Sequence, residues 1–104
     1  MNLSPQTIEI HFKEVLAISE KIKRVSEELE RIGQEVIPEI LCDTKRRWNS
    51  EAARKLVERE LKMGNEYCNA ARCLGALAAE LSEQAQEMYK TEMCNLTLAS
   101  TRIY

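Results

Sequence analysis

The sequence contains little of what folds other than long helices require. Its 104 residues include only 3 Gly, 2 Pro and 5% aromatic residues, which leaves few turns and few of the side chains that favour β-strands. A single His offers little with which to build a catalytic cleft in so short a chain. We therefore expect one all-α domain spanning residues 1–104, with no catalytic residues and no enzymatic activity.

The chain also lacks a large charge of either sign and any long hydrophobic run. Lys and Arg number 15 against 17 Asp and Glu, a net charge of −2, whereas nucleic-acid binders normally show a basic excess. No segment approaches the roughly 20 apolar residues that cross a bilayer, and residues 1–6 have neither the basic nor the apolar region of a Sec signal peptide. We expect no nucleic-acid partner, no membrane insertion, and either a cytoplasmic protein or one exported in folded form.

The first predicted helix covers about residues 5–45 and begins with a clear start signal. Ser4 is a favourable N-cap, and Pro5 suits the first helical position, where its missing N–H costs nothing. Leu3 and Ile8 can form a hydrophobic staple across this start.

Apolar residues then recur with a heptad spacing along this helix. Position a holds Ile8, Val15, Ile22, Leu29 and Val36, and position d holds His11, Ile18, Val25 and Ile32. Pro38 removes a helical hydrogen bond, so we expect a kink near residue 38, with Ile40 and Leu41 packed in a further turn. His11 is most simply a half-exposed residue of the stripe, because no catalytic partner set is visible.

A second helix is predicted over about residues 50–93, after a turn at about residues 44–49 and before a mobile tail at residues 95–104. It carries two apolar rows and a shoulder of small residues that would let a neighbouring helix approach closely. The rows are Leu56, Met63, Ala70 and Leu77, and Tyr67, Leu74, Leu81 and Met88; the shoulder is Gly64, Ala71, Gly75, Ala78, Ala79 and Ala85.

The two stripes have matching lengths on either side of Trp48. Folding the chain there pairs Val15 with Leu81, Ile22 with Leu74, and Leu29 with Tyr67, which predicts an antiparallel two-helix hairpin. A lone hairpin buries only one side of each helix. We therefore expect the small-residue shoulder and the remaining apolar positions to pack against a second hairpin, giving a four-helix bundle made from two chains.

Four cysteines raise the question of a metal site or a disulfide. There is no Cys-x-x-Cys pair and no second His, so the usual zinc-binding patterns are absent. Cys68 and Cys73 would lie about 8.6 Å apart on one helix, beyond disulfide reach, while Cys42 and Cys94 fall at opposite ends of the hairpin. We expect four free thiols, no metal and no cofactor.

The turn region carries an unusual combination of residues. A basic cluster, Lys45, Arg46 and Arg47 followed by Arg54 and Lys55, could contact phosphate or an acidic partner, although overall acidity favours a solvated loop. Trp48 is the single tryptophan and belongs to neither stripe. It either caps the ends of the helices or contacts another molecule, and position alone favours the cap.

These features together resemble the WXG family, the small substrates of type VII (ESX-type) secretion systems. The segment from Trp48 to Leu56, Trp-Asn-Ser-Glu-Ala-Ala-Arg-Lys-Leu, is similar to the family's Trp-X-Gly turn followed by small residues and an apolar anchor. The resemblance covers residues 5–95 in architecture and residues 48–56 in motif. It implies head-to-tail dimers that form four-helix bundles.

The sequence departs from the family pattern at two places. Ser50 stands where the family has Gly, and Ser can serve there as the N-cap of the second helix. The family's export signal is Tyr, three residues, then Asp or Glu, whereas Tyr89 is followed by Glu92, one position early. Tyr89, which is freer than the core residue Tyr67, and Glu92 are therefore candidates for a displaced export signal.

The resemblance implies a non-enzymatic protein exported by, or acting as a partner in, a type VII system. It would be cytoplasmic before export and secreted without a Sec signal peptide, as a homodimer or as a heterodimer with a similar hairpin. Trp48 would lie beside the partner's C-terminal tail in a composite recognition surface. The alternatives are a cytoplasmic targeting partner of a larger type VII toxin and a general coiled-coil adaptor.

Overall fold

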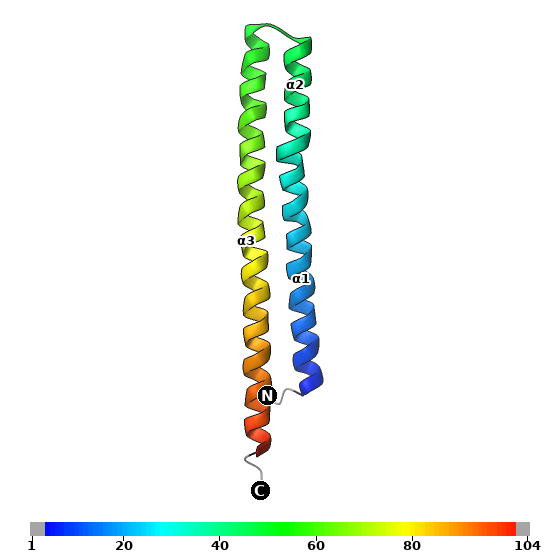
Figure 1. Cartoon of the computed structure of the whole chain (residues 1–104), viewed down its shortest axis with the longest axis vertical. Helices are drawn as coiled ribbons and strands as arrows, with labels where there is room; N and C mark the ends of the chain where they lie inside the picture. Colours follow the sequence, from blue (N-terminus) through cyan, green and yellow to red (C-terminus); the bar gives the residue numbers. More distant parts are fainter. Residues whose placement is uncertain (1–3, 102–104) are drawn as a thin grey trace. The chain divides into compact units, whose positions relative to one another are not determined.

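The computed structural model describes residues 4–101, which are helical apart from a short connection (Figure 1). The elements in chain order are α1 (Pro5–Arg31), a π-helical turn η1 (Ile32–Val36), α2 (Ile37–Arg47) and α3 (Glu51–Thr101). No strand occurs between residues 4 and 101, so the predicted all-α class is confirmed.

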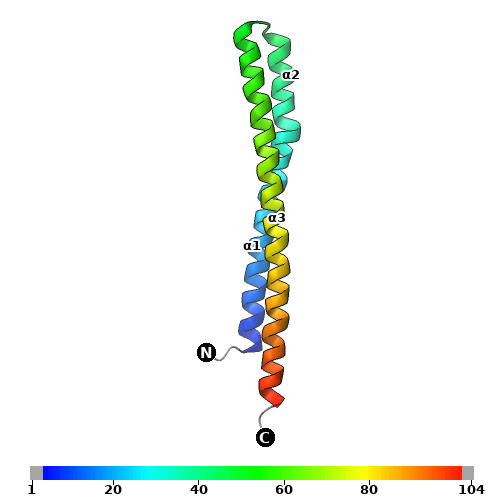
Figure 2. The ribbon, with the colours of Figure 1, turned by 90° about the vertical axis from the view of Figure 1, so that its left-hand side faces the viewer.

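The chain divides into two compact units. The first combines residues 1–22 with residues 77–104, and the second is the continuous segment 23–76. In the first unit the N-terminal part of α1 runs beside the C-terminal part of α3 (Figures 1 and 2). The second unit is an antiparallel helical hairpin, in which the end of α1, η1 and α2 lead through the turn into the first half of α3.

Both predicted N-caps are present. The backbone N–H of Thr7 donates to Ser4 Oγ at 3.1 Å, and that of Ala53 donates to Ser50 Oγ at 3.2 Å. In each case a serine hydroxyl satisfies one of the amides that a helix start leaves without a partner. The staple assigned to Leu3 falls outside the described residues, while Ile8 is the most deeply buried large side chain described.

Pro38 changes the helix without breaking it. The five residues before α2 form the π-helical turn η1, and the N–H of Ile37 donates to the carbonyl of Ile32, five residues back. A wider turn accommodates a proline that cannot donate and whose ring would crowd the preceding carbonyls. The one-residue offset turns Ile37 inward and leaves Ile40 exposed, so the expected packing of Ile40 was wrong.

The helix boundaries differ from the predicted ones at both ends of the turn and at the C-terminus. α2 continues to Arg47 and α3 begins at Glu51, so the connection is residues 48–50 rather than 44–49. α3 continues to Thr101, and no Gly or Pro follows Gly75 in the sequence to weaken its last turns. Thr97 Oγ1 donates to the carbonyl of Met93 at 3.0 Å. Residues 95–101 are therefore helical instead of the expected mobile tail, and residues 102–104 lie outside the described part.

Small residues line the contact between the paired helices. Members of this seam recur every seven residues: Ser19, Ser26 and Gly33 before the turn, and Gly64, Ala71, Ala78 and Ala85 in α3, all buried. Ser19 Oγ donates to the carbonyl of Ala78, and Ser26 Oγ to that of Ala71, each at 2.7 Å. Gly64, Ala71, Ala78 and Ala85 of the small-residue shoulder thus pack within the chain, which corrects their assignment to a second molecule, whereas Gly75 is half-buried and Ala79 is exposed.

Candidate functional site

Large apolar side chains stand exposed on one side of this seam. The residue preceding six of the seven seam positions is apolar: Ile18 and Leu77 in the first unit, and Val25, Ile32, Met63 and Ala70 in the second; the exception is Gln84, which precedes Ala85. Two antiparallel helices turn in opposite senses when viewed from one end, so positions preceding the seam lie on the same side of it in each unit. We call these six residues the apolar rows.

The exposure of the apolar rows is high for side chains of this kind. Ile18 is 51% exposed in the first unit, and Val25 is 52% and Met63 48% exposed in the second. The residues that follow the seam positions instead include Glu20, Glu27, Gln34, Asn65 and Arg72, all exposed. The seam therefore separates an apolar side from a largely polar side in each unit.

The six residues predicted to form the hairpin or dimer seam lie at the border of the apolar rows. All are half-buried: Val15, Ile22, Leu29, Tyr67, Leu74 and Leu81. Large side chains at this border are partly covered by the neighbouring helix and partly open. Sequence periodicity found these residues, but it missed Ser19 and Ser26, which are polar and therefore invisible to an apolar pattern. Their seven-residue spacing with Gly33 was the available signal.

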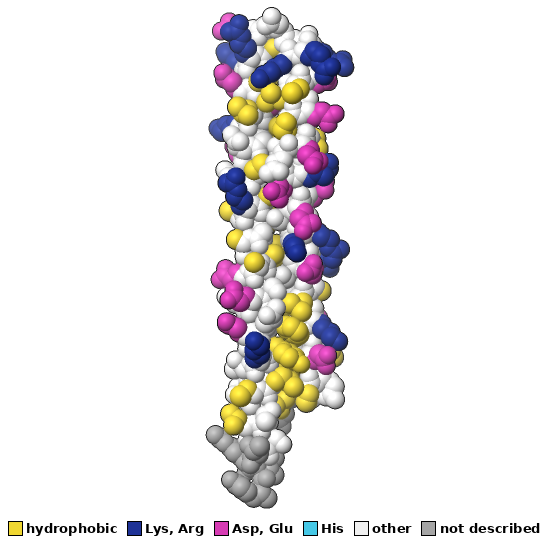
Figure 3. Space-filling view, in the orientation of Figure 1, with side chains coloured by type: hydrophobic (Ala, Val, Ile, Leu, Met, Phe, Trp, Pro, Cys, Tyr) yellow, Lys and Arg dark blue, Asp and Glu magenta, His cyan; other side chains and the backbone are white. Residues whose placement is uncertain are grey.

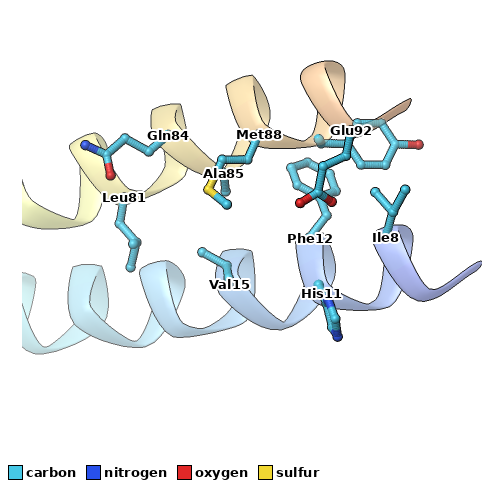
Figure 4. Close-up of a pocket in the computed structure, with 10 residues that line it drawn as sticks. Ile8, His11, Phe12, Val15, Leu81, Gln84, Ala85, Met88 and Glu92 are labelled. Carbon is cyan, nitrogen blue, oxygen red and sulfur yellow. The ribbon is translucent and has the colours of Figure 1, made fainter. Parts of the chain in front are cut away.

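A hollow of about 210 Å³ lies in the first unit between α1 and the C-terminal part of α3. Phe12, Val15, Leu81 and Met88 contribute to its lining (Figure 4). The rings of Phe12 and Tyr89 pack with their centroids 4.6 Å apart. His11 also borders the hollow, although its imidazole points away from α3 (Figure 4).

The packing of Tyr89 changes its interpretation. Tyr89 and Glu92 are both half-buried and both border this hollow. The ring of Tyr89 packs against Phe12 within the chain, and Tyr89 is half-buried like Tyr67, so its packing does not set it apart from Tyr67 as the prediction required. The two candidate export-signal residues lie one helical turn apart on α3.

Trp48 terminates α2 and projects from the turn. Its backbone N–H donates to the carbonyl of Thr44 at 2.9 Å, and its φ of −128° and ψ of 124° are those of extended chain. The side chain is 63% exposed. An indole this exposed does not cover the helix ends, so the structure argues against the cap.

Thr44 of α2 and Glu60 of α3 form a polar pair between the two helices near the turn. Thr44 Oγ1 donates to the carbonyl of Ile40 at 2.9 Å and lies 3.1 Å from Glu60 Oε1. The other carboxylate oxygen, Glu60 Oε2, is buried without a hydrogen-bond partner in the described part of the chain. An unsatisfied buried oxygen destabilises the fold unless something compensates for it.

The cysteines are all free: Cys42, Cys73 and Cys94 are exposed and Cys68 is half-buried. Among residues 4–101, no three His, Cys, Asp or Glu side chains gather as a metal site would require. None of the described helices is both long enough and apolar enough to cross a membrane. The candidate functional features are therefore the apolar rows and the turn around Trp48.

Comparison with known proteins adds no relative. No family model matches the chain, and neither the curated proteins nor the solved structures provide a match. Functional inference consequently depends on the geometry of this chain and on the resemblance carried by residues 48–56.

Proposed function

We propose that the protein is a non-enzymatic helical-hairpin protein that works as a dimer, and that it is a WXG-like substrate or partner of a type VII secretion system. The observation that carries the first part is the pair of exposed apolar rows beside a seam already filled by small residues. The second part depends on the Trp48 turn.

The apolar rows suit a second copy of the same chain. Exposed apolar patches on soluble proteins often mark an interaction site, and each unit carries exposed large apolar side chains beside its seam. A two-fold interface places the same surface against itself, so like charges in it would repel. The rows contain no Asp, Glu, Lys or Arg, and two copies can therefore meet without electrostatic cost, as in a four-helix bundle.

Two isoleucines of α1 provide a matched test of this association. Ile18 belongs to the apolar rows, whereas Ile10 is equally exposed, at 55%, and lies away from them on the outer side of the same helix. Ile18→Glu should convert a species of about twice 12.0 kDa into one of single mass, measured by light scattering. Ile10→Glu should remain dimeric, and both variants should keep wild-type helicity by circular dichroism.

The mass of the unmodified protein decides between the possible partners. A stable single-mass species at all concentrations would contradict the homodimer. Recovery of a stable complex only after co-expression with another hairpin would replace it by a heterodimer. Equal loss of association in both isoleucine variants would show that the apolar rows are not the interface.

The secretion part of the proposal is tested through the turn. Trp48 is largely exposed and lies outside the seam, and its bond to Thr44 comes from its backbone N–H, so Trp48→Ala should leave helicity and melting temperature nearly unchanged. Export into the medium should require an intact type VII system and should be lost in this variant. Asn49→Ala, at the exposed neighbouring position, should be exported normally.

Two export results would contradict this part of the proposal. Export that continues without the type VII membrane ATPase would exclude the pathway. Normal export of Trp48→Ala would remove the turn from recognition and leave a coiled-coil adaptor as the better interpretation.

A further inference from the structure

The turn of the second unit is the most basic part of the protein. Lys45, Arg46 and Arg47 occupy the last turn of α2, and Arg54 and Lys55 lie at the start of α3, all five exposed. We call these five residues with Trp48 the basic tip. Figure 3 shows Lys and Arg side chains gathered at this end of the second unit.

Acidic neighbours offset only part of this charge. Asp43 Oδ1 lies 3.5 Å from Arg46 Nη2 and 3.4 Å from Arg47 Nε, and both arginine side chains remain about three-quarters exposed. Between residues 43 and 58 the five basic residues face three acidic ones, Asp43, Glu51 and Glu58, a net charge of +2. The chain as a whole has a net charge of −2, so the tip is locally opposite in sign.

The indole of Trp48 lies among these cations with its backbone fixed. A shallow hollow of about 280 Å³ adjoins it, bordered by Lys45, Arg54 and Val57 among others. An exposed indole surrounded by Lys and Arg is the arrangement found at membrane interfaces, where the ring sits at headgroup level and the cations meet anionic lipids.

We infer that the basic tip docks on the surface of an anionic lipid bilayer, as a peripheral contact without insertion of a helix. The alternative occupant, an acidic protein, fits the composition of the tip less well. The tip is one indole among five exposed Lys and Arg side chains, whereas a stable protein interface takes about 800 Å² from each partner and is depleted of charged residues at its core. A lipid surface needs no such area, because each exposed cation contributes separately.

This inference is independent of the proposed dimer, because the apolar rows and the basic tip share no residue. It predicts weak binding that depends on lipid charge and on salt, since exposed charges are screened within about 10 Å at 0.1 M ionic strength. The single tryptophan lies within the tip and reports contact directly.

The test uses the full chain and vesicles of phosphatidylcholine alone or with an equal part of phosphatidylserine. Flotation should recover at least fivefold more protein with the anionic vesicles. The fluorescence of Trp48 should shift to shorter wavelength only with them, and 0.5 M NaCl should reverse both effects. Equal recovery with the two vesicle types, no recovery with either, or an unshifted emission would overturn the inference.

Two double substitutions distinguish binding through the basic tip from a general effect of the net charge of the protein. Arg54→Glu with Lys55→Glu should reduce recovery at least fivefold, and acidic residues in a first helical turn are favourable for folding. Lys23→Glu with Arg24→Glu makes the same charge change at an exposed site on α1 and should bind like the unmodified protein. Equal effects from both pairs would overturn the assignment to the tip.

A soluble polyanion distinguishes lipid from an acidic protein surface. Polyglutamate at the same concentration of negative charge should leave the Trp48 emission unshifted, because it offers no apolar layer for the indole. A larger shift with polyglutamate than with anionic vesicles would overturn the lipid assignment in favour of an acidic peptide.

Discussion

Replacing Gly33 by Ala tests the closest approach between the two helices of the second unit. A Cβ atom at Gly33 would lie 2.7 Å from Cys68 Sγ, 3.0 Å from the carbonyl oxygen of Gly64 and 3.3 Å from the amide nitrogen of Cys68. The thiol could rotate away, but the other two atoms belong to the backbone of α3. Relief would therefore require the helices to move apart.

The expected loss follows from two opposing effects. Ala in place of Gly favours a helix by about 1 kcal/mol, whereas overpacking a close contact costs about 1–3 kcal/mol. Because backbone atoms are involved, we place the overpacking term near the top of that range and expect a net loss of about 1–2 kcal/mol. For a chain of this size, that lowers the melting temperature by roughly 5–10 °C.

The measurement is thermal unfolding followed by circular dichroism at one fixed protein concentration, since association would raise the apparent stability. Gly75→Ala is the matched control, because its Cβ would meet only Ser26 Oγ, at 3.2 Å, and its stability should change by less than about 1 kcal/mol. A melting temperature of Gly33→Ala at or above that of the unmodified protein would refute the close packing of this seam.

Three further substitutions test individual contacts by the same unfolding measurement. Ser50→Ala removes the cap of α3 and should cost about 1 kcal/mol, and an unchanged midpoint would show that the 3.2 Å bond to Ala53 contributes nothing. Ser26→Ala should cost about 1 kcal/mol through its lost bond to the Ala71 carbonyl, and a gain in stability would contradict this. Glu60→Leu should stabilise by about 1 kcal/mol because it removes the unsatisfied oxygen, whereas the exposed Glu58→Leu should change little.

Local chemistry was the part of the fold most readily predicted from sequence. The caps at Ser4 and Ser50 depend on one side chain and the next three backbone amides, so spacing alone identifies them. The disturbance caused by Pro38 was also predictable, because a missing N–H acts on the adjacent turn. The form of this disturbance, a π-helical turn rather than a kink, depends on packing against α3. It could not be predicted from the sequence.

Hydrophobic periodicity could not predict which residues form the seam between the paired helices. That pattern marks a broad apolar sector but does not say which edge of it meets the neighbouring helix. Gly33 and Gly64 allow the backbones to approach closely, and the hydroxyl of Ser26 finds a carbonyl across the gap. The large residues therefore lie at the open edge of the apolar sector and are only half-buried. The hydrophobic pattern had predicted that they lie in the core.

The candidate site was predictable in position but not in detail. The isolation of Trp48 from both stripes left a cap and a contact with another molecule as alternatives, and only the structure distinguishes an exposed indole from a cap. Tyr89 was predicted to be freer than Tyr67, but its ring packs against Phe12. This contact joins residues that are far apart in sequence. Contacts of that kind require the pairing of the helices to be known first.

The π-helical turn at Ile32–Val36 acts as a one-residue insertion whose effect is confined to the residues that follow it. Replacing it by an ordinary helical turn without removing a residue would rotate all of α2 by about 100° relative to the preceding end of α1. Ile40 would then turn inward in place of Ile37, and the cations of the last turn would face a different direction. The orientation of the tip is thus set separately from the seam of α1, so a substitution that converts the π-helical turn into an ordinary one would redirect the tip and leave that seam intact.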